Sequence, residues 1–599
     1  MRGFRVVLAA LAALSAGPAF AQAAGEDSAV VDTSCGHDCL IGHLDKYIAA
    51  LRAGDASRLH VTGDVRFTED DVVLPLGKGL WQTVTDVDRQ GLEVADPITG
   101  NAAWFGGVRE NGVPAIYAVR IHVSHGLIDE IESVVNRKTT MMGPFGDATK
   151  LHHDPAFNDV LAPEEQRPRE RLLAIAHSYF DTVELNDGQV FAPFSDDCER
   201  LENGMSTTAA PKNGGFGAGN LSVGCLNQFK LGIYKINKRV RRYYPIVDTE
   251  RGIVVAAGFF DHANEFDHYK LTDGRDMKTA LKWPNSISLL EAFRIKNGEI
   301  QRIEAVFTYV PYFMHNPFWG PDSSPPQYAP QPEACNDACL DADARNVMKA
   351  MVGNHWQTVD WADKVGYGED SVGVRIGEGT WATVTAVDDK PLVIADAQTG
   401  KAVWIGRIED HGQPAWAAVT VTAAGKKVGA VDAVFRRKEY KAPYAEPAAA
   451  PSFGELAKGQ RTSREDMLKA IDGFYVAFNA HQGQVPAGLA DGCQWTANGQ
   501  ALGACAAPFV ANSLQWLAGF RDRRVLAVDE ARGLVAVEGF EDQPSVPRSF
   551  TGPNGTTMPN PTSYPRTLQV VEVFRFKDGR VEQIQRISSE LPYGMQPHR

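Results

Sequence analysis

The sequence predicts an α+β protein with four tandem domains, each a curved antiparallel sheet wrapped around N-terminal helices. Two observations predict this architecture. The chain of 599 residues is too long for one hydrophobic core, because single cores stop growing at about 250–300 residues. The chain also contains two internal repeats, and each repeated unit begins with a helical pattern and continues with alternating strand patterns.

The first repeat, called module A, aligns without a gap when the chain is shifted by 300 residues. The stretch 77–88 (GKGLWQTVTDVD) then matches 377–388 (GEGTWATVTAVD), and Arg137 matches Arg437. A helical pattern at LDKYIAALRAGD is followed by strand patterns and a terminal hairpin. Module A is therefore expected to place one helix before a sheet.

The second repeat, called module B, begins with an amphipathic helix in which Leu172, Ile175, Ala176 and Tyr179 share one face. Two strand patterns joined at DTERG follow, and a hairpin with KNGE at its tip ends the module. A shift of 281 residues places this hairpin on VEVFRFKDGRVEQIQRISSE near the C-terminus.

The modules alternate as A1, B1, A2 and B2, which is a tandem duplication of a two-domain protein. Two of the three segments between them are rich in proline and alanine and are expected to be irregular. The predicted boundaries are 1–21 for a signal peptide, 30–140 for A1, 165–318 for B1, 333–440 for A2 and 460–599 for B2.

Charge and the N-terminus limit the function classes. The net charge is −14 without long runs of one sign, whereas a nucleic-acid binder needs a basic face. Residues 1–21 have the pattern of a cleaved secretory signal, because Arg2 and Arg5 precede an apolar run and AFA precedes Gln22. We therefore expect a periplasmic or secreted protein that does not contact a membrane after cleavage.

The eight cysteines fall into close pairs, which predicts disulfide bonds in an exported chain. The expected pairs are Cys35–Cys39, Cys198–Cys225, Cys335–Cys339 and Cys493–Cys505. The two C-x-x-x-C pairs could instead be metal or redox sites. Zinc usually takes four ligands, so two such pairs would have to meet, and we predict no metal site.

A family resemblance rests on the opening helix of module B, on DDCERLENG, on the strand end at 258–261 and on the hairpin EAFRIKNGEIQRIEAVF. These features resemble the SnoaL-like proteins of the NTF2-like superfamily, and module A shares their order of elements. The resemblance implies a cone-shaped domain with an apolar pocket open at one end. The family uses such pockets for cofactor-independent isomerisation, cyclisation, dehydration, epoxide opening and lyase chemistry, or for binding alone, so fold does not decide the function.

Candidate site residues come from comparing the two copies of module B. Several polar groups occur only in B1, which is therefore predicted to be the working copy: Glu202, Thr207, His177, His262, Glu304 and Tyr309. Asn203, Asp261 and Glu291 occur in both copies. Asn203 is typical of a turn, and Glu291 lies mid-strand, either on a solvated face or in the pocket wall. Carboxylates and imidazoles in an apolar pocket shift their pKa values towards neutrality and become usable acids or bases.

We assign His262, Asp261 and Glu202 as the catalytic acid, base or orienting groups. The expected substrate-binding groups are Asn203, Thr207, Glu291, Glu304, Tyr309 and His177. The doubled Phe-Asp-His triplet in 258–270 (GFFDHANEFDHYK) could also bind a metal, but its spacing matches no known motif. The glycine-rich stretch 214–220 (GGFGAGN) is expected to be a flexible flap over the B1 pocket.

Three functions stay open on these grounds. The first is an exported, cofactor-independent acid–base enzyme of lyase, dehydratase or isomerase type that acts on a small, partly apolar molecule in B1. The second is a non-catalytic binding protein for a hydrophobic ligand or a partner protein. The third is a structural protein with filled pockets. No cofactor is expected, and a homodimer is common in the resembled family.

Overall fold

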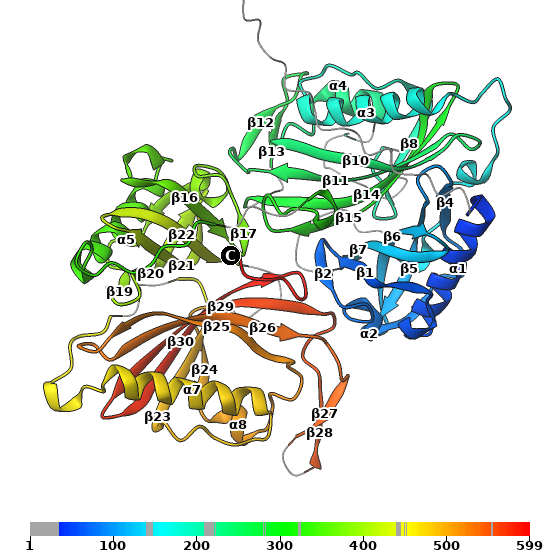
Figure 1. The fold of residues 1–599 in the computed structure, drawn as a ribbon. Helices are drawn as coiled ribbons and strands as arrows, with labels where there is room; N and C mark the ends of the chain where they lie inside the picture. Colours follow the sequence, from blue (N-terminus) through cyan, green and yellow to red (C-terminus); the bar gives the residue numbers. More distant parts are fainter. Residues whose placement is uncertain are drawn as a thin grey trace, which may run out of the picture.

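The computed structural model describes residues 35–138, 148–208, 221, 223–279, 281, 283–320, 325–438, 445–447, 450, 452–552 and 555–598. The predicted signal peptide and the predicted flap at 214–220 lie outside these residues. Within the described part of the chain, no helix is both long enough and apolar enough to span a bilayer. The architecture is α+β, with four large curved sheets and few helices (Figure 1).

Modules A1 and A2 share one topology. The strand order is β2-β1-β7-β6-β5-β3 in A1 and β17-β16-β22-β21-β20-β18 in A2, with β4 paired to β5 and β19 to β20. The A1 elements are α1 (His37–Arg52), β1 (Val61–Glu69), β2 (Val72–Leu74), α2 (Leu80–Thr83), β3 (Val84–Val87), β4 (Leu92–Asp96), β5 (Asn101–Glu110), β6 (Val113–Ser124) and β7 (Leu127–Arg137). The A2 elements are α5 (Asp337–Met351), β16 (Trp361–Glu369), β17 (Val372–Gly373), α6 (Thr380–Thr383), β18 (Val384–Val387), β19 (Leu392–Asp396), β20 (Lys401–Asp410), β21 (Gln413–Ala424) and β22 (Lys427–Arg436).

Modules B1 and B2 also share one topology, with strand order β10-β11-β14-β15-β8-β9 in B1 and the matching β25-β26-β29-β30-β23-β24 in B2. The B1 elements are α3 (Arg169–Leu185), β8 (Phe194–Glu202), β9 (Met205–Ser206), α4 (Cys225–Leu231), β10 (Arg239–Asp248), β11 (Ile253–His262), β12 (His268–Lys270), β13 (Asp276–Lys278), β14 (Asn285–Lys296) and β15 (Glu299–Val310). The B2 elements are α7 (Arg464–Ala480), β23 (Leu489–Ala497), β24 (Gln500–Ala504), α8 (Ala507–Val510), β25 (Gly519–Asp529), β26 (Leu534–Gln543), β27 (Ser549–Thr551), β28 (Thr557–Pro559), β29 (Arg566–Lys577) and β30 (Arg580–Leu591).

The four large sheets are antiparallel as expected, except that one pair of neighbouring strands in each runs parallel. The pairs β1–β7, β8–β15, β16–β22 and β23–β30 run parallel. In each case the strand that follows the N-terminal helix lies beside the last strand of the module. Most of the module separates these two strands in the sequence, so no tight hairpin dictates an antiparallel direction.

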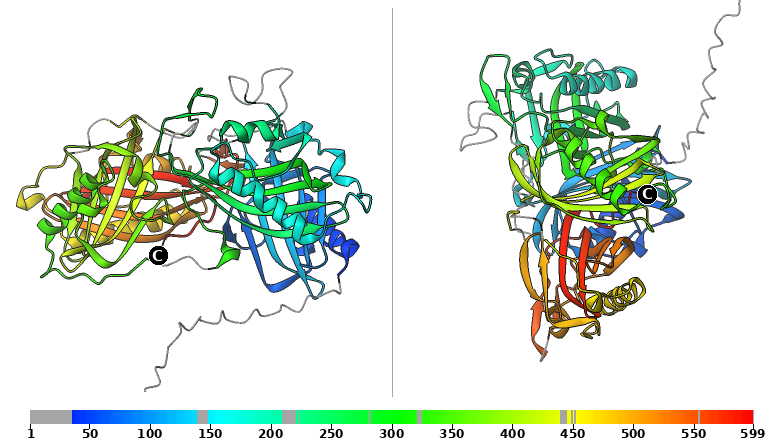
Figure 2. Two further views of the ribbon diagram at one scale, coloured as in Figure 1. Left: turned by 90° about the horizontal axis from the view of Figure 1, so that it is seen from above. Right: turned by 90° about the vertical axis from the view of Figure 1, so that its left-hand side faces the viewer.

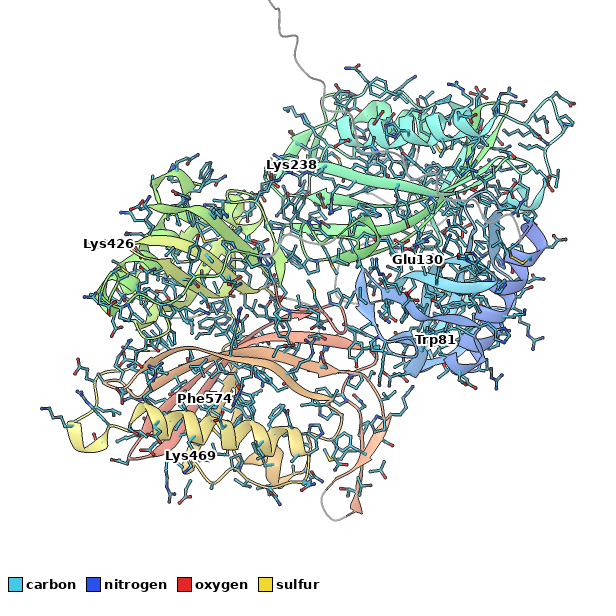
Figure 3. All side chains as sticks on the ribbon, in the orientation of Figure 1. Trp81, Glu130, Lys238, Lys426, Lys469 and Phe574 are labelled. Carbon is cyan, nitrogen blue, oxygen red and sulfur yellow. A yellow bond between two sulfur atoms is a disulfide. The ribbon has the colours of Figure 1, made fainter. Side chains whose placement is uncertain are left out.

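Each B sheet is covered on both faces. In B1, helix α3 packs on one face through Tyr179 and Phe180, which contact Phe293 on β14. The other face packs against the A1 sheet, where Leu290 and Phe105 belong to one buried cluster. A2 and B2 pack in the same way, and side chains fill the space between the sheets (Figure 3). The A and B sheets therefore cover each other within one chain.

A repeated aspartate joins each A module to its B module. Asp96 accepts a hydrogen bond from the Val247 backbone N–H at 2.9 Å and pairs with Arg169 at 2.7 Å. Asp396, its equivalent, accepts from Val528 N–H at 3.0 Å and pairs with Arg464. Each A module therefore contacts the B module that follows it in the same way.

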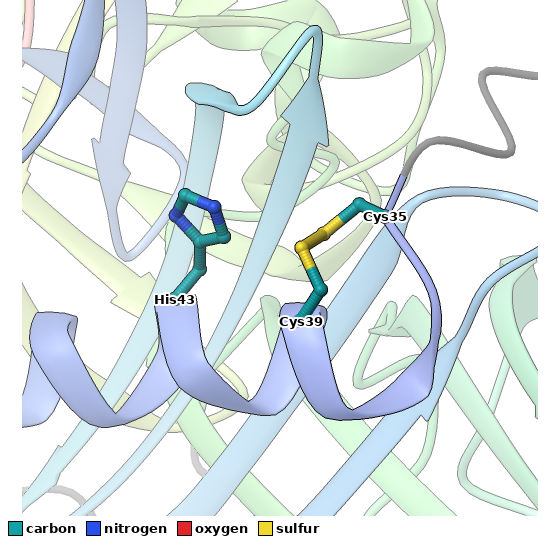
Figure 4. A group of neighbouring side chains, drawn as sticks. All are labelled: Cys35, Cys39 and His43. Atoms are coloured by element: carbon teal, nitrogen blue, oxygen red, sulfur yellow. A yellow bond between two sulfur atoms is a disulfide. The ribbon is translucent and has the colours of Figure 1, made fainter.

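The four predicted disulfides are confirmed. The structure joins Cys35–Cys39, Cys198–Cys225, Cys335–Cys339 and Cys493–Cys505. His43 lies one turn of α1 beyond Cys39 (Figure 4), and a similar group contains Asp343 near Cys339. Because the sulfur atoms are bonded to each other, neither C-x-x-x-C pair offers thiolate ligands for a metal. Disulfides are typical of proteins from oxidising compartments.

Candidate functional site

The inner face of the B1 sheet is the face that α3 covers. Side chains alternate between the two faces of a strand, so Glu291, Phe293 and Ile295 of β14 point towards the helix. On the same face, Ile287 and Leu289 form a separate apolar cluster with Ala305 and Phe307 of β15. Glu291 therefore lies between the helix-packed core and a second apolar patch.

Glu291 is the most unusual ionisable group on this face. It is 2% exposed, and the Tyr179 hydroxyl donates a hydrogen bond to its Oε1 at 3.1 Å. Its Oε2 has no hydrogen-bond partner among the described residues. Burial raises the pKa of Glu291 to about 8, while Arg200 opposes this shift and Glu202 adds to it. A carboxyl group with such a pKa can hold or release a proton near neutral pH.

Arg200 and Glu202 on β8 lie beside this carboxyl group. Arg200 is 1% exposed, and its Nε is 3.5 Å from Glu202 Oε1. The guanidinium also donates to Thr207 Oγ1 at 3.2 Å and to Gln228 Oε1 at 2.7 Å. These contacts fix the guanidinium position, so Arg200 can orient a polar substrate group or stabilise negative charge.

Tyr309 lies at the apolar end of the face, where its ring packs against Phe307 with centroids 6.3 Å apart. Burial, with a smaller contribution from Glu202, raises the pKa of Tyr309. Glu202, Thr207, Glu291 and Tyr309 are thus four predicted site residues that the structure places on or beside one face.

Asp261 and His262 do not lie together, because consecutive residues of β11 point to opposite faces. Asp261 is buried on the outer face, where Arg241 holds both of its oxygens at 2.8 and 3.0 Å and Ser286 Oγ donates at 2.6 Å. His262 is 3% exposed, and its Nδ1 is 3.0 Å from Asn285 Oδ1. Burial lowers the pKa of His262, which favours the neutral ring.

The other predicted residues have different surroundings. Asn203 adopts φ 47°, and its Oδ1 accepts from Phe307 N–H at 2.8 Å, as expected of a turn residue. Glu304 is on the outer face, 2.6 Å from His153 Nδ1. Burial lowers the pKa of His153, but the carboxylates of Glu304 and Asp88 together raise it above its ordinary value. His177 is on the exposed side of α3 and contacts Tyr244 Oη at 3.1 Å.

Module B2 surrounds the equivalent glutamate differently. Glu572 is fully buried and accepts a hydrogen bond from Tyr475, as Glu291 does from Tyr179. However, Arg586 stands opposite Glu572 in the sheet and donates to it at 2.8 Å, and also pairs with Glu541 at 2.7 Å. In B1 the position opposite Glu291 is Ala305. Only B1 therefore leaves the shared glutamate without a direct arginine partner among the described residues.

Glu291 was among the predicted substrate-binding groups, whereas Arg200 was not predicted. The structure shows that the shared glutamate has different neighbours in the two copies. The signal was the exchange of Ala305 for Arg586 and of Arg200 for Trp495. This signal can be recognised only after the strand pairing shows which residues lie opposite each other.

A family model described as a domain of unknown function (DUF8021) matches residues 165–307 and 460–588, which lie in B1 and B2. Together the two matches span less than half of the chain. No curated protein matches the sequence.

Several solved structures resemble part of the chain. One is an LEH-like epoxide hydrolase from M. tuberculosis, at 16% identity over 21% of this chain and 84% of that chain, with a TM-score of 0.16. Others are a candidate polyketide cyclase from Xanthomonas campestris (21% identity, 21% and 92% covered, TM-score 0.16) and a candidate hydroxylase from Streptomyces galilaeus (12% identity, 21% and 91% covered, TM-score 0.16). At these scores the likenesses carry no weight for the function of this chain.

Proposed function

We propose that the chain is an exported enzyme whose B1 module performs cofactor-independent acid–base chemistry on a small, partly apolar molecule. The reaction class is elimination, dehydration or isomerisation. The buried Glu291 carboxyl group, with a pKa of about 8 and one unpartnered oxygen, carries this proposal. The sequence predicts an NTF2-like cone, and the pocket of such a cone would lie on this face of the sheet.

The residues have distinct roles in this proposal. Glu291 transfers the proton, and Tyr179 holds its Oε1 so that Oε2 faces the reacting atom. Arg200, paired with Glu202, stabilises negative charge that develops on the substrate. The apolar side chains of Ile287, Leu289, Ala305 and Phe307 bind the carbon skeleton. Proton transfer by a positioned side chain contributes about 10²–10⁴-fold to a rate.

The ring opening of 5-nitrobenzisoxazole tests the proposal, because this reaction needs only one base in an apolar surrounding. We expect the wild-type chain to accelerate this reaction. The rate should rise with pH as Glu291 loses its proton, with the midpoint of the rise at about pH 8. Glu291→Gln should lower the rate by about 10²–10⁴-fold. Glu572→Gln, the matched change in B2, should leave the rate unchanged.

Equal effects of the two substitutions would overturn the assignment to B1. A wild-type chain with no rate above the Glu291→Gln background would overturn the base role of Glu291. Binding of the probe without acceleration would favour the non-catalytic binding protein instead.

A further inference from the structure

A small pocket of about 120 Å³ lies at one end of the B1 sheet, and we call it the strand-end pocket. Its wall consists of residues 235–238 before β10, residues 263–266 after β11, Thr279 and Leu281. The A1-B1 and A2-B2 halves lie side by side (Figure 2), and Asp267, which follows this wall, is 3.4 Å from His411 of A2. Glu291 and Arg200 are not part of the wall, so the strand-end pocket is separate from the site described above.

Two asparagines in the buried part of this wall lack hydrogen-bond partners. Asn237 is 8% exposed, yet neither its Oδ1 nor its Nδ2 has a partner among the described residues. Asn264 is 7% exposed, and its Oδ1 is also without a partner in that part of the chain. Burying an amide without hydrogen bonds costs stability, so such groups are rare. Their place in a pocket wall indicates that a bound molecule supplies the missing hydrogen bonds.

Module B2 provides a reference for Asn237. Asn237 N–H donates to the carbonyl three residues earlier at 3.0 Å, and Leu517 N–H of B2 does the same at 3.0 Å. In both modules the next residue donates its N–H to the shared aspartate, Asp261 or Asp542. Leu517 is buried in the B2 core. The fold therefore accepts an apolar side chain of the same branched shape at this position, and packing does not require the amide of Asn237.

The equivalent of Asn264 in B2 has its partners. Asn264 and Ser545 both adopt positive φ, 52° and 60°. Ser545 Oγ donates to Thr562 O at 2.8 Å and accepts from Asn111 of A1 at 3.1 Å. Of the two modules, only B1 therefore has a buried acceptor at this position without a partner among the described residues.

The unpaired groups indicate which ligand chemistry would complement them. A planar side-chain amide offers a donor and an acceptor side by side, and its complement is a second amide with N–H and C=O on the same edge. Open-chain secondary amides are trans and keep these groups on opposite sides, whereas a small ring holds them on one edge. The Oδ1 of Asn264 requires one further donor.

The rest of the wall suits a small uncharged ring. Its charged residues, Lys235, Lys238 and Glu265, are exposed, and Lys238 pairs with Glu265 at 2.7 Å. Ala263 and Leu281 are buried apolar groups. A cavity of about 150 Å³ holds benzene, so the strand-end pocket suits about five or six non-hydrogen atoms.

We propose that the strand-end pocket binds a compact cyclic urea or lactam. The cis-amide edge of the ligand pairs with both amide atoms of Asn237, and the second N–H of a cyclic urea donates to Asn264 Oδ1. The ligand thus binds apart from the Glu291 site, whether or not B1 is an enzyme.

Saturation-transfer NMR of the full chain with 2-imidazolidinone at pH 7 tests this proposal. Cyclopentanone is the control, because it has the same ring size and carbonyl group but no N–H donor. 2-Imidazolidinone should bind at least about tenfold more tightly, since a buried acceptor left unpaired costs about that much affinity. Equal binding of the two compounds, or no binding of 2-imidazolidinone, would overturn the proposal and leave the two asparagines to water.

Asn237→Leu introduces the residue that B2 has at the equivalent position. The preference for 2-imidazolidinone over cyclopentanone should disappear in this variant. Its midpoint of unfolding in guanidinium chloride should not fall, because the variant no longer buries an unpaired amide. A folded variant that keeps the preference contradicts the strand-end site.

Asn264→Ser is the second variant and decides the question if Asn237→Leu does not fold. It introduces the serine that B2 has at the same positive φ, so the turn is expected to form. Binding of 2-imidazolidinone should weaken by about tenfold, because the Oδ1 acceptor is removed. Unchanged binding would contradict the role of Asn264 and the strand-end site.

Glu291→Gln separates this site from the function proposed for B1. Binding of 2-imidazolidinone should survive that substitution, because Glu291 does not line the strand-end pocket. Loss of binding in Glu291→Gln would place the ligand on the inner face of B1 and overturn the strand-end site, whatever the catalytic result.

Discussion

Modules B1 and B2 have the same topology and the same buried tyrosine–glutamate pair, but they neutralise the glutamate in different ways. In B2, Arg586 stands opposite Glu572 and pairs with it at 2.8 Å. In B1, Ala305 stands opposite Glu291, whose pKa rises to about 8. The residue opposite the glutamate on the neighbouring strand therefore makes the difference. Arginine gives a structural ion pair in B2, and alanine leaves a candidate acid or base in B1.

The comparison teaches that a shared residue is not necessarily a structural one. Burial of an unpaired carboxyl group costs several kcal/mol, which the group avoids by staying protonated. B2 retains the ion pair, and B1 retains a carboxyl group that can change its protonation state. Perturbed pKa values of this kind cluster at functional sites.

The largest expected effect comes from breaking the B2 ion pair. Arg586→Met should destabilise the chain by about 3–5 kcal/mol, because it leaves Glu572 and Glu541 buried without their cation. Urea unfolding followed by tryptophan fluorescence measures the loss, since Arg586 stacks on Trp495 at 5.2 Å. Arg586→Met combined with Glu572→Gln should recover part of the stability. A loss below about 1 kcal/mol in the single variant would show that Glu572 does not need the pair.

The next effect is the pH dependence of stability. The folded pKa of Glu291 is about 8 and lies above its ordinary value of 4.5. Between these values the folded chain keeps a proton that the unfolded chain has lost. This group therefore lowers the unfolding free energy by about 1.4 kcal/mol per pH unit as pH rises, until the effect levels off above about 8.

Glu291→Gln removes that contribution. The unfolding free energy of the variant should fall less steeply with pH between about 5 and 8 than that of the wild-type chain. Asp70 and Glu369, each with a pKa of about 7, act in the same direction in both proteins and cancel in the difference. Denaturant midpoints at several pH values measure it, and parallel curves for the two proteins would contradict the raised pKa.

Repeats and disulfides could be predicted from the sequence because they depend on identity and spacing. The shift of 300 residues aligned Asp96 with Asp396, and the structure shows that both join their A module to a B module. The α+β architecture followed from the order of helical and strand patterns. The parallel strand pairs could not be predicted, since no local signal tells which distant strand becomes a neighbour.

The candidate site was only partly predictable for a related reason. Alternation along β11 separates Asp261 from His262, but which face would be lined by α3 depended on tertiary packing. The sequence left open whether Glu291 lies on a solvated face or in the pocket wall, and the structure shows that it is buried. Its contrast with Glu572 arises from the register of β14 with β15, which fixes whether alanine or arginine stands opposite.

The smallest expected effect is in the tyrosines that contact the two glutamates. Tyr475→Phe removes a hydrogen bond to the ion-paired Glu572 and should cost about 1.5–3 kcal/mol. Tyr179→Phe removes a hydrogen bond to Glu291, which is largely protonated at pH 7, and should cost only about 0.5–1.5 kcal/mol. Urea midpoints at pH 7 measure both.

At pH 9, where Glu291 is ionised, the cost of Tyr179→Phe should rise towards that of Tyr475→Phe. A pH-independent cost of Tyr179→Phe would contradict a change in the charge of Glu291 between pH 7 and pH 9, and the difference between B1 and B2 would then lie in shape and not in charge.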